Sequence, residues 1–188
     1  MMLLTLCFAI ASCDSKKNQD STDMAEEQND ARGNDDTEKD ADFAVEAANA
    51  GLLEVQLGTL GTTKATSARV KQFAQMMVDD HTKANNELKA LASEKGIALP
   101  DVINEDAQKE YYDLEQKEKG NEFDKEFMDQ MVEDHREVIR KFEREADNGN
   151  DPDVKAWAAG KLAALRHHLE EAERIQESLK DSNTARNN

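Results

Sequence analysis

The amino-acid sequence predicts an all-α domain in which four long helices pack as a bundle. The chain has only two prolines in 188 residues, and Ala, Glu, Lys, Leu and Met, all good helix formers, dominate it. Alternating runs of β-branched residues, which indicate strands, do not occur. Apolar residues instead recur at alternating steps of three and four, the spacing of a helix that buries one face.

The first two predicted helices cover residues 41–64 and 67–95. Ser67 is a good residue to start the second helix, and Gly96, followed by Pro100, is a good residue to end it. The apolar stripe of the first helix contains Phe43, Ala47, Ala50, Leu57 and Gly61, and that of the second contains Val70, Ala74, Met77, Ala84, Leu88 and Leu91.

A long connection at 97–121 follows, and we expect a short helix near 104–117 within it. The last two predicted helices cover residues 122–147 and 152–180, and Pro152 in the first turn of the final helix favours its start. Two short hairpins joined by one long connection favour a ferritin-like crossover between the second and third long helices. Simple up-down order is the alternative.

Each apolar stripe is interrupted once, near its middle, by a residue that can bind a metal. These residues are Glu54, His81, His135 and His168. At about 1.5 Å per residue, they lie at levels that differ by about one helical turn or less. We therefore expect one carboxylate and three imidazoles to meet in the core, a set that suits Fe, Mn, Zn or Cu. The alternative is a structural polar layer in which Glu54 accepts hydrogen bonds from the histidines.

Other residues near this layer receive simpler interpretations. Asp80 and Asp134 directly precede two of the histidines and are candidate partners for the imidazole rings. His167 lies off its stripe and is expected at the surface. The sequence offers no Ser/His/Asp arrangement and no phosphate-binding loop, so no catalytic residue and no organic cofactor are predicted.

The N-terminal segment predicts export and lipidation. Residues 3–13, LLTLCFAIASC, form an apolar run that is too short to span a bilayer, which needs about 20 residues. Its end, Ile10-Ala11-Ser12-Cys13, resembles the lipobox of a bacterial lipoprotein. We therefore expect residues 1–12 to be removed as a signal peptide and Cys13 to carry the lipid. No Lys or Arg opens the run, so we expect a start upstream or a truncated leader.

An acidic segment separates this anchor from the helical domain. Residues 14–42 hold eleven acids against four bases, and Met24 is their only large apolar residue. Such a composition predicts disorder, so we interpret 13–41 as the lipidated cysteine and a disordered linker. The helical domain is predicted at 42–180 and a disordered tail at 181–188. The net charge of −17 and the lack of a basic patch predict no nucleic-acid partner. Membrane contact is expected through the lipid on Cys13.

Four segments resemble the domain-of-unknown-function family 4142 over about residues 42–179. They are AANAGLLEVQLGTLG, VKQFAQMMVDDHTKANNELKALASEKGIALP, EFMDQMVEDHREVIRKFEREA and DPDVKAWAAGKLAALRHHLEEA, and two of them contain an MVxDH motif. The resemblance implies a ferritin-like fold in an exported, often outer-membrane, protein of Gram-negative bacteria. The family positions correspond to Glu54, His81, His135 and His168, and the family brings no assigned reaction.

The chain departs from true di-iron ferritins, which need a Glu-x-x-His motif on each of two helices. Val78, Val132 and Leu165 stand three residues before the histidines. If a metal binds, a mononuclear histidine-rich site is therefore the expectation.

Three functions follow from these patterns. The main expectation is a cell-envelope lipoprotein, anchored in the outer membrane and facing the periplasm or the cell surface. It would act as a binding or stress-related accessory module, with an unidentified envelope protein as partner and with no enzyme activity assigned. The second is a mononuclear transition-metal-binding protein or metal-dependent oxidoreductase that uses the Glu/His3 set. The third is a purely structural bundle that binds a partner.

Overall fold

The computed structural model describes residues 20–32 and 35–186, and this part of the chain is all-α, with no strand. The prediction of an all-α fold is confirmed. None of the described helices is both long and apolar enough to cross a membrane. The six helices are α1 (Ser21–Asp30), α2 (Asp35–Lys64), α3 (Ala68–Lys95), α4 (Glu105–Glu115), α5 (Asn121–Asn148) and α6 (Pro152–Arg186).

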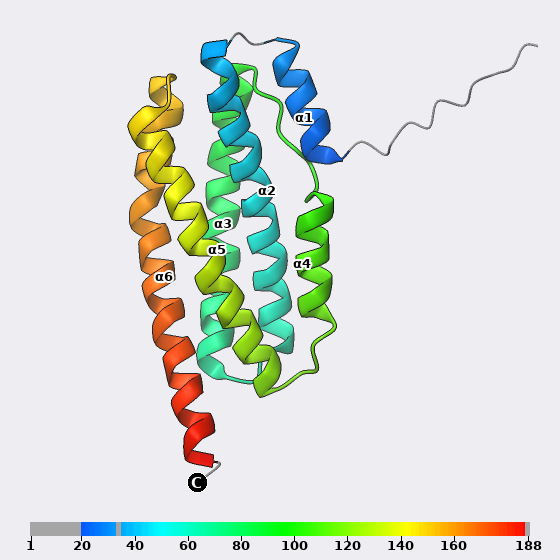
Figure 1. The fold of residues 1–188 in the computed structure, drawn as a ribbon, viewed down its shortest axis with the longest axis vertical. Helices are drawn as coiled ribbons and strands as arrows, with labels where there is room; N and C mark the ends of the chain where they lie inside the picture. The colour runs from blue at the N-terminus through cyan, green and yellow to red at the C-terminus, as the bar shows by residue number, and fades with distance from the viewer. Residues whose placement is uncertain (1–19, 33–34, 187–188) are drawn as a thin grey trace, which may run out of the picture.

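The four long helices lie side by side (Figure 1). Helix α2 packs along α3 and α5 packs along α6, while α2 also contacts α5 and α3 contacts α6. Helices α3 and α5 run in the same direction, so the segment between them returns along the whole length of the molecule (Figure 1). This connection contains α4, which packs on α2 and α5. The long connection predicted from the sequence is therefore a crossover, and the order is not simple up-down.

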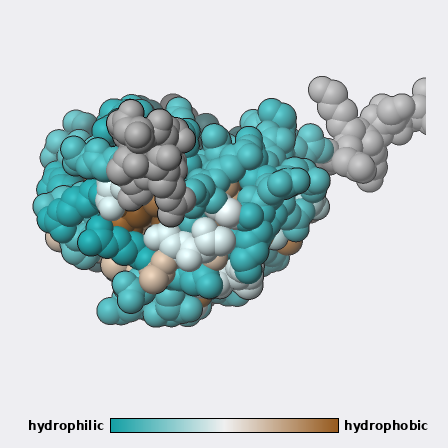
Figure 2. Space-filling model, turned by 90° about the horizontal axis from the view of Figure 1, so that it is seen from below, coloured by the Kyte–Doolittle hydropathy of each residue, from teal (hydrophilic) through white to brown (hydrophobic). Residues whose placement is uncertain are grey.

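The core consists of two apolar clusters separated by a polar layer. One cluster, toward the α2–α3 turn, includes Leu57, Met77, Phe127 and Met131. The other, toward the α5–α6 turn, includes Phe43, Leu88, Phe142, Val154 and Leu165. Seen from the end that carries the α2–α3 turn, the surface is mostly hydrophilic, and apolar side chains show only in a small area (Figure 2). The apolar stripes are thus turned inward, and the four predicted site residues lie between the clusters.

The close approach of α2 and α3 depends on glycine, which has no side chain, at their contact. A Cβ atom on Gly61 would lie 2.7 Å from the Cβ of Ala74 and 3.0 Å from the Phe127 ring. Contacts this short do not occur between carbon atoms, so any larger residue would force the helices apart. Gly61, together with Gly58, therefore permits the close spacing of this helix pair.

Buried carboxylates hold the two hairpin turns. Asp124, at the start of α5, accepts hydrogen bonds from the Thr66 and Ser67 backbone N–H groups at 2.9 and 2.8 Å. Ser67 occupies the N-cap position of α3, as predicted, but its own side chain makes no capping bond. Asp40 accepts a hydrogen bond from the Asn150 backbone N–H at 2.9 Å in the α5–α6 turn. Each hairpin is thereby fixed by a helix of the other hairpin, which aligns the levels of all four.

The structure differs from the disordered linker predicted over 13–41, because α1 and the first turns of α2 lie in this range. Asp20 accepts a hydrogen bond from the Thr22 backbone N–H at 2.9 Å and caps α1. The buried Asn29 accepts a bond from the Ala98 N–H at 2.7 Å and donates one to the Ala98 carbonyl at 3.0 Å. Small buried residues such as Ala25 complete the contact with the rest of the domain. Polar anchoring thus replaces the large apolar side chains that the segment lacks.

The structure bears on the predicted C-terminal tail but not on the predicted signal peptide. Helix α6 continues to Arg186, which differs from the disordered tail predicted at 181–188. The predicted signal peptide at 1–12 and the predicted lipidation site Cys13 lie outside the described residues.

Candidate metal centre

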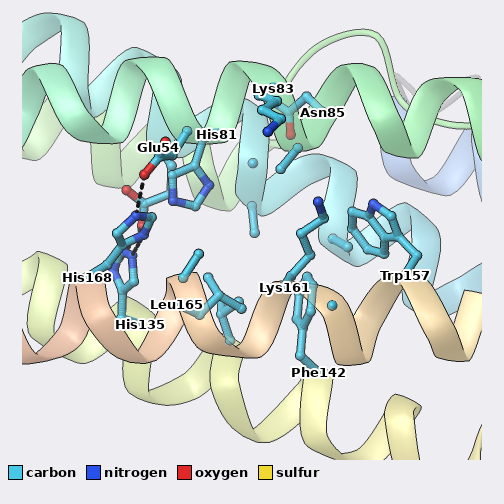
Figure 3. A pocket seen from close by; sticks show the side chains of 18 residues that line it. Glu54, His81, Lys83, Asn85, His135, Phe142, Trp157, Lys161, Leu165 and His168 are labelled. Carbon is cyan, nitrogen blue, oxygen red and sulfur yellow. Dashed lines mark hydrogen bonds and ion pairs between the residues drawn. The ribbon is translucent and has the colours of Figure 1, made fainter.

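The four residues singled out by sequence come from four different helices. Glu54 lies on α2, His81 on α3, His135 on α5 and His168 on α6 (Figure 3). Their exposed fractions are 4%, 9%, 1% and 2%, respectively. Polar side chains buried this deeply are costly unless they are paired or bound to an ion.

Three of these residues converge. One ring nitrogen from each of His81, His135 and His168 lies within 4.8 Å of the other two. The ring centroids are 5.7 Å apart for His81 and His135, 5.5 Å for His81 and His168, and 5.3 Å for His135 and His168. We call these three residues the histidine triad.

The hydrogen-bond partners assign the proton on two of the rings. His135 Nδ1 lies 2.8 Å from the Met131 carbonyl oxygen, which only accepts, so neutral His135 carries its proton on Nδ1. His168 Nε2 lies 2.9 Å from Asp80 Oδ2, so the carboxylate draws the proton of His168 to Nε2. His135 Nε2 and His168 Nδ1 then both present lone pairs.

These two lone pairs face each other across 3.3 Å. Two acceptors at that distance repel unless a proton or a metal ion lies between them. His81 contributes a third nitrogen, because its Nε2 is buried and has no hydrogen-bond partner among the described residues. A proton bonded to the Met131 carbonyl or to Asp80 on the far side of the ring is the usual arrangement of a metal-binding histidine.

The spacing of the nitrogens suits a small transition-metal ion. Zinc–nitrogen bonds of about 2.0–2.1 Å in a tetrahedron place two ligand nitrogens about 3.3–3.4 Å apart. His135 and His168 already stand at this separation. Since all three nitrogens lie within 4.8 Å of one another, only His81 must approach further to complete the set.

The electrostatic surroundings keep the triad neutral. Burial lowers the pKa of His135 to about 4, and neighbouring His168 contributes to the shift. Burial, followed by His135 and His168, lowers the pKa of His81 well below its usual value. Burial also lowers the pKa of His168, although Asp80 opposes the shift. Because imidazole binds metal only when it is deprotonated, the triad is in its ligand form at neutral pH.

Glu54 does not join the converging nitrogens, and this differs from the four-ligand set predicted from the sequence. Its Oε1 lies 3.7 Å from Nδ1 of His135, the nitrogen that bonds Met131, and so on the side of the ring away from the lone pair. Its Oε2 is buried and has no hydrogen-bond partner among the described residues. Helical periodicity placed Glu54 at the correct level, but it does not define which side of a neighbouring ring a carboxylate reaches.

Asp80 takes a role that spacing alone does not give. It precedes His81 in the sequence, yet it bonds His168 of the neighbouring helix.

Asp134, the corresponding residue before His135, has a buried Oδ2 with no hydrogen-bond partner among the described residues. Burial, followed by Glu110, raises the pKa of Asp134 to about 7. His167 is exposed, as predicted. The repeated Asp-His pairs were the sequence signal for both carboxylates.

A family model described as a domain of unknown function, DUF4142, matches residues 24–175. The chain belongs to this family. The match contains the whole histidine triad and extends over most of α1. The searches of curated proteins and of solved structures found no match. The family description assigns no reaction, so the geometry of the site is the basis for a proposed function.

The triad forms one end of a cavity of about 260 Å³ in the DUF4142 domain. Figure 3 shows the three rings gathered at this end, with Phe142, Trp157 and Lys161 toward the other. Lys161 pairs with Glu87, and its Nζ lies 5.9 Å from the centroid of the Trp157 ring. An ion held by the triad would therefore keep one side open to a chamber with apolar and charged side chains in its walls.

Proposed function

We propose that this DUF4142 protein binds one transition-metal ion through His81, His135 and His168. The observation that carries the proposal is the pair of opposed lone pairs on His135 and His168, 3.3 Å apart, beside the unpartnered Nε2 of His81. Three neutral imidazoles suit Zn²⁺ and Cu²⁺ best, and also Fe²⁺, whereas Mn²⁺ prefers oxygen ligands.

A purely structural polar layer fits the same residues less well. Such a layer would need a proton between His135 and His168, which would make one of the rings an imidazolium. Burial lowers the pKa of both rings, so this proton is held only in acid. At neutral pH a metal ion relieves the repulsion without that cost.

The proposal is tested by titrating Zn²⁺ into chelator-treated protein and following the heat of binding. We expect one equivalent per chain for the natural protein and a loss of affinity of at least about 100-fold for His135→Ala. His167→Ala is the matched control, because its ring is exposed and belongs to the neighbouring position of α6. Zn²⁺ should also raise the unfolding temperature of the natural protein but not of His135→Ala. Equal Zn²⁺ binding by the natural protein and His135→Ala would refute the site.

The proposal also covers the fold family of the domain and its location in the cell. We propose that the four long helices form a ferritin-like bundle whose centre holds a mononuclear ion, since Val78, Val132 and Leu165 occupy the positions where di-iron proteins carry glutamate. We also propose that the lipid on Cys13 anchors the domain in the outer membrane, facing the periplasm or the cell surface. The lipobox-like leader supports this location. An envelope protein partner stays a prediction.

Metal-dependent chemistry on a small molecule is a second candidate, favoured by the cavity beside the triad. In Co²⁺-loaded protein, azide should change the visible absorption spectrum, because it can occupy a free coordination position that faces the cavity. If azide leaves the spectrum unchanged at saturating concentration, the open position does not exist. The role would then be metal carriage or storage.

A further inference from the structure

A second cavity, of about 400 Å³, lies on the other side of Glu54. Among the residues that the structure describes, its walls carry seven carboxylate side chains, contributed by α1, α2, α4 and α5, and one cationic residue, Lys141. Lys141 is already engaged with Glu46 at 3.1 Å and with Glu137 at 3.0 Å. Carboxylates therefore predominate in the walls of this cavity, and we call it the acidic cavity.

The innermost carboxylate of this cavity lacks a partner. Glu54 is 4% exposed, and its Oε2 has no hydrogen-bond partner among the described residues. Buried carboxylates that repel one another are stabilised when a cation stands among them. The unpartnered oxygen thus indicates a place for positive charge.

Glu54 also connects the acidic cavity with the triad. It belongs to the walls of both cavities, and its Oε1 lies 3.7 Å from His135. The cavity that contains the triad is lined by two cations, Lys83 and Lys161, and by two carboxylates, Glu54 and Asp80, so its charges nearly balance. The two approaches to the triad therefore differ in electrostatic character, and the acidic one favours cations.

The carboxylates of the acidic cavity are too widely spaced to chelate a bare ion. Among the described residues, the triad is the only group of three or more potential ligands whose donor atoms lie within 4.8 Å of one another. A cation in the acidic cavity would thus keep much of its water and be held by charge and by hydrogen bonds from that water.

We propose that the acidic cavity collects a hydrated divalent cation and passes it by Glu54 to the histidine triad. This inference rests on the proposed function, because the triad is the destination. Helices α1 and α4 form part of the cavity wall, which gives the two helices outside the four long ones a defined role. The Glu105 backbone N–H donates to Asp20 at 2.8 Å and ties the two helices together.

The test is the rate of Co²⁺ uptake by the full chain, measured by stopped-flow absorption of the histidine-bound ion. The variant Glu110→Gln/Glu137→Gln removes two charges from the cavity and no triad residue. We expect uptake to slow by about three- to tenfold, with the same final absorbance. Glu177→Gln/Asp181→Asn is the matched control, because it removes the same charge from the end of α6. This control should keep the natural rate.

The outcomes separate this inference from the proposed function. Equal rates in the cavity variant and the control would overturn it, as would a loss of final absorbance in the cavity variant, which would make these carboxylates ligands. If the natural protein gives no Co²⁺ signal, the triad proposal fails instead. Mn²⁺ binding, followed by electron paramagnetic resonance, then tests the acidic cavity alone. Binding that Glu110→Gln/Glu137→Gln does not weaken would overturn the inference.

Discussion

At the scale of single residues, the site depends on where each imidazole keeps its proton. The Met131 carbonyl holds the proton of His135 and the Asp80 carboxylate holds that of His168, each on the outer side of its ring. The inner nitrogens keep free lone pairs that can bind a metal ion, because burial disfavours their protonation. Two of the three ligands are therefore arranged before any ion arrives, and this preorganisation limits the cost of binding.

Removal of the Asp80 carboxylate should weaken metal binding without changing the stoichiometry. Asp80→Ala leaves all three ligands in place but frees the His168 ring, so we expect about 10- to 100-fold weaker Zn²⁺ affinity. Calorimetric titration measures the change. Asp79→Ala is the control, since Asp79 is exposed and its side chain accepts a hydrogen bond from Gln75 in the adjacent turn. An affinity for Asp80→Ala equal to that of the control would show that Asp80 does not orient the ring.

At the scale of helices and turns, buried carboxylates set the levels of the four long helices. Asp124 fixes the α2–α3 turn and Asp40 fixes the α5–α6 turn. Glu145 on α5 lies beside Asp40, and burial followed by Asp40 raises the pKa of Glu145 to about 7. The triad converges only if these turns hold, so the helix ends contribute to the geometry of a site at mid-height.

Loss of the Asp124 carboxylate should destabilise the fold. Asp124→Ala removes a buried carboxylate and leaves the Thr66 and Ser67 backbone N–H groups of a part-buried turn without their acceptor, so we expect a loss of about 2–4 kcal/mol in the free energy of unfolding. Urea denaturation measures it. Glu122→Ala, an exposed position in the same first turn of α5, should cost less than about 1 kcal/mol. Equal losses for the two variants would contradict the capping role.

The raised pKa of Glu145 predicts a pH dependence of stability. Because the folded pKa of about 7 lies above the usual value of 4.5, the folded state binds the extra proton. The contribution of Glu145 to stability is complete below pH 4.5 and is lost as the pH rises through 7. Buried histidines act in the opposite sense, since their lowered pKa values remove stability as the pH falls below about 6.5.

A comparison of Glu145→Gln with the natural protein isolates this group. In metal-free protein, we expect the variant to gain about 1–2 kcal/mol relative to the natural protein between pH 5 and pH 8. Urea denaturation at the two pH values measures the difference. Parallel pH profiles would contradict the assignment of the raised pKa to Glu145.

At the scale of the whole molecule, hydrophobic periodicity predicted what each helix buries but not how side chains meet across helices. It predicted the long helices and the common level of the site residues. It did not predict the position of Glu54 behind His135 or the bond from Asp80 to His168, because both depend on helix rotation and side-chain torsion. Composition also missed α1, which is held by polar bonds to distant residues such as Ala98.

The predicted anchor concerns the whole molecule as well. Cys13→Ala should move the expressed protein from the membrane fraction to the soluble fraction, because the lipid is the expected membrane contact. Cys7→Ala should leave it in the membrane fraction, since Cys7 belongs to the predicted leader. Fractionation followed by immunoblotting reads out both variants. Retention of Cys13→Ala in the membrane would exclude Cys13 as the anchor.

X-ray absorption at the zinc edge of Zn²⁺-loaded protein tests the central claim most directly. The account predicts one zinc per chain with three imidazole nitrogens at about 2.0–2.1 Å and one further light ligand. It also predicts that the imidazole scattering weakens in His135→Ala. A shell made of oxygen atoms alone, or an identical spectrum for His135→Ala, would contradict it.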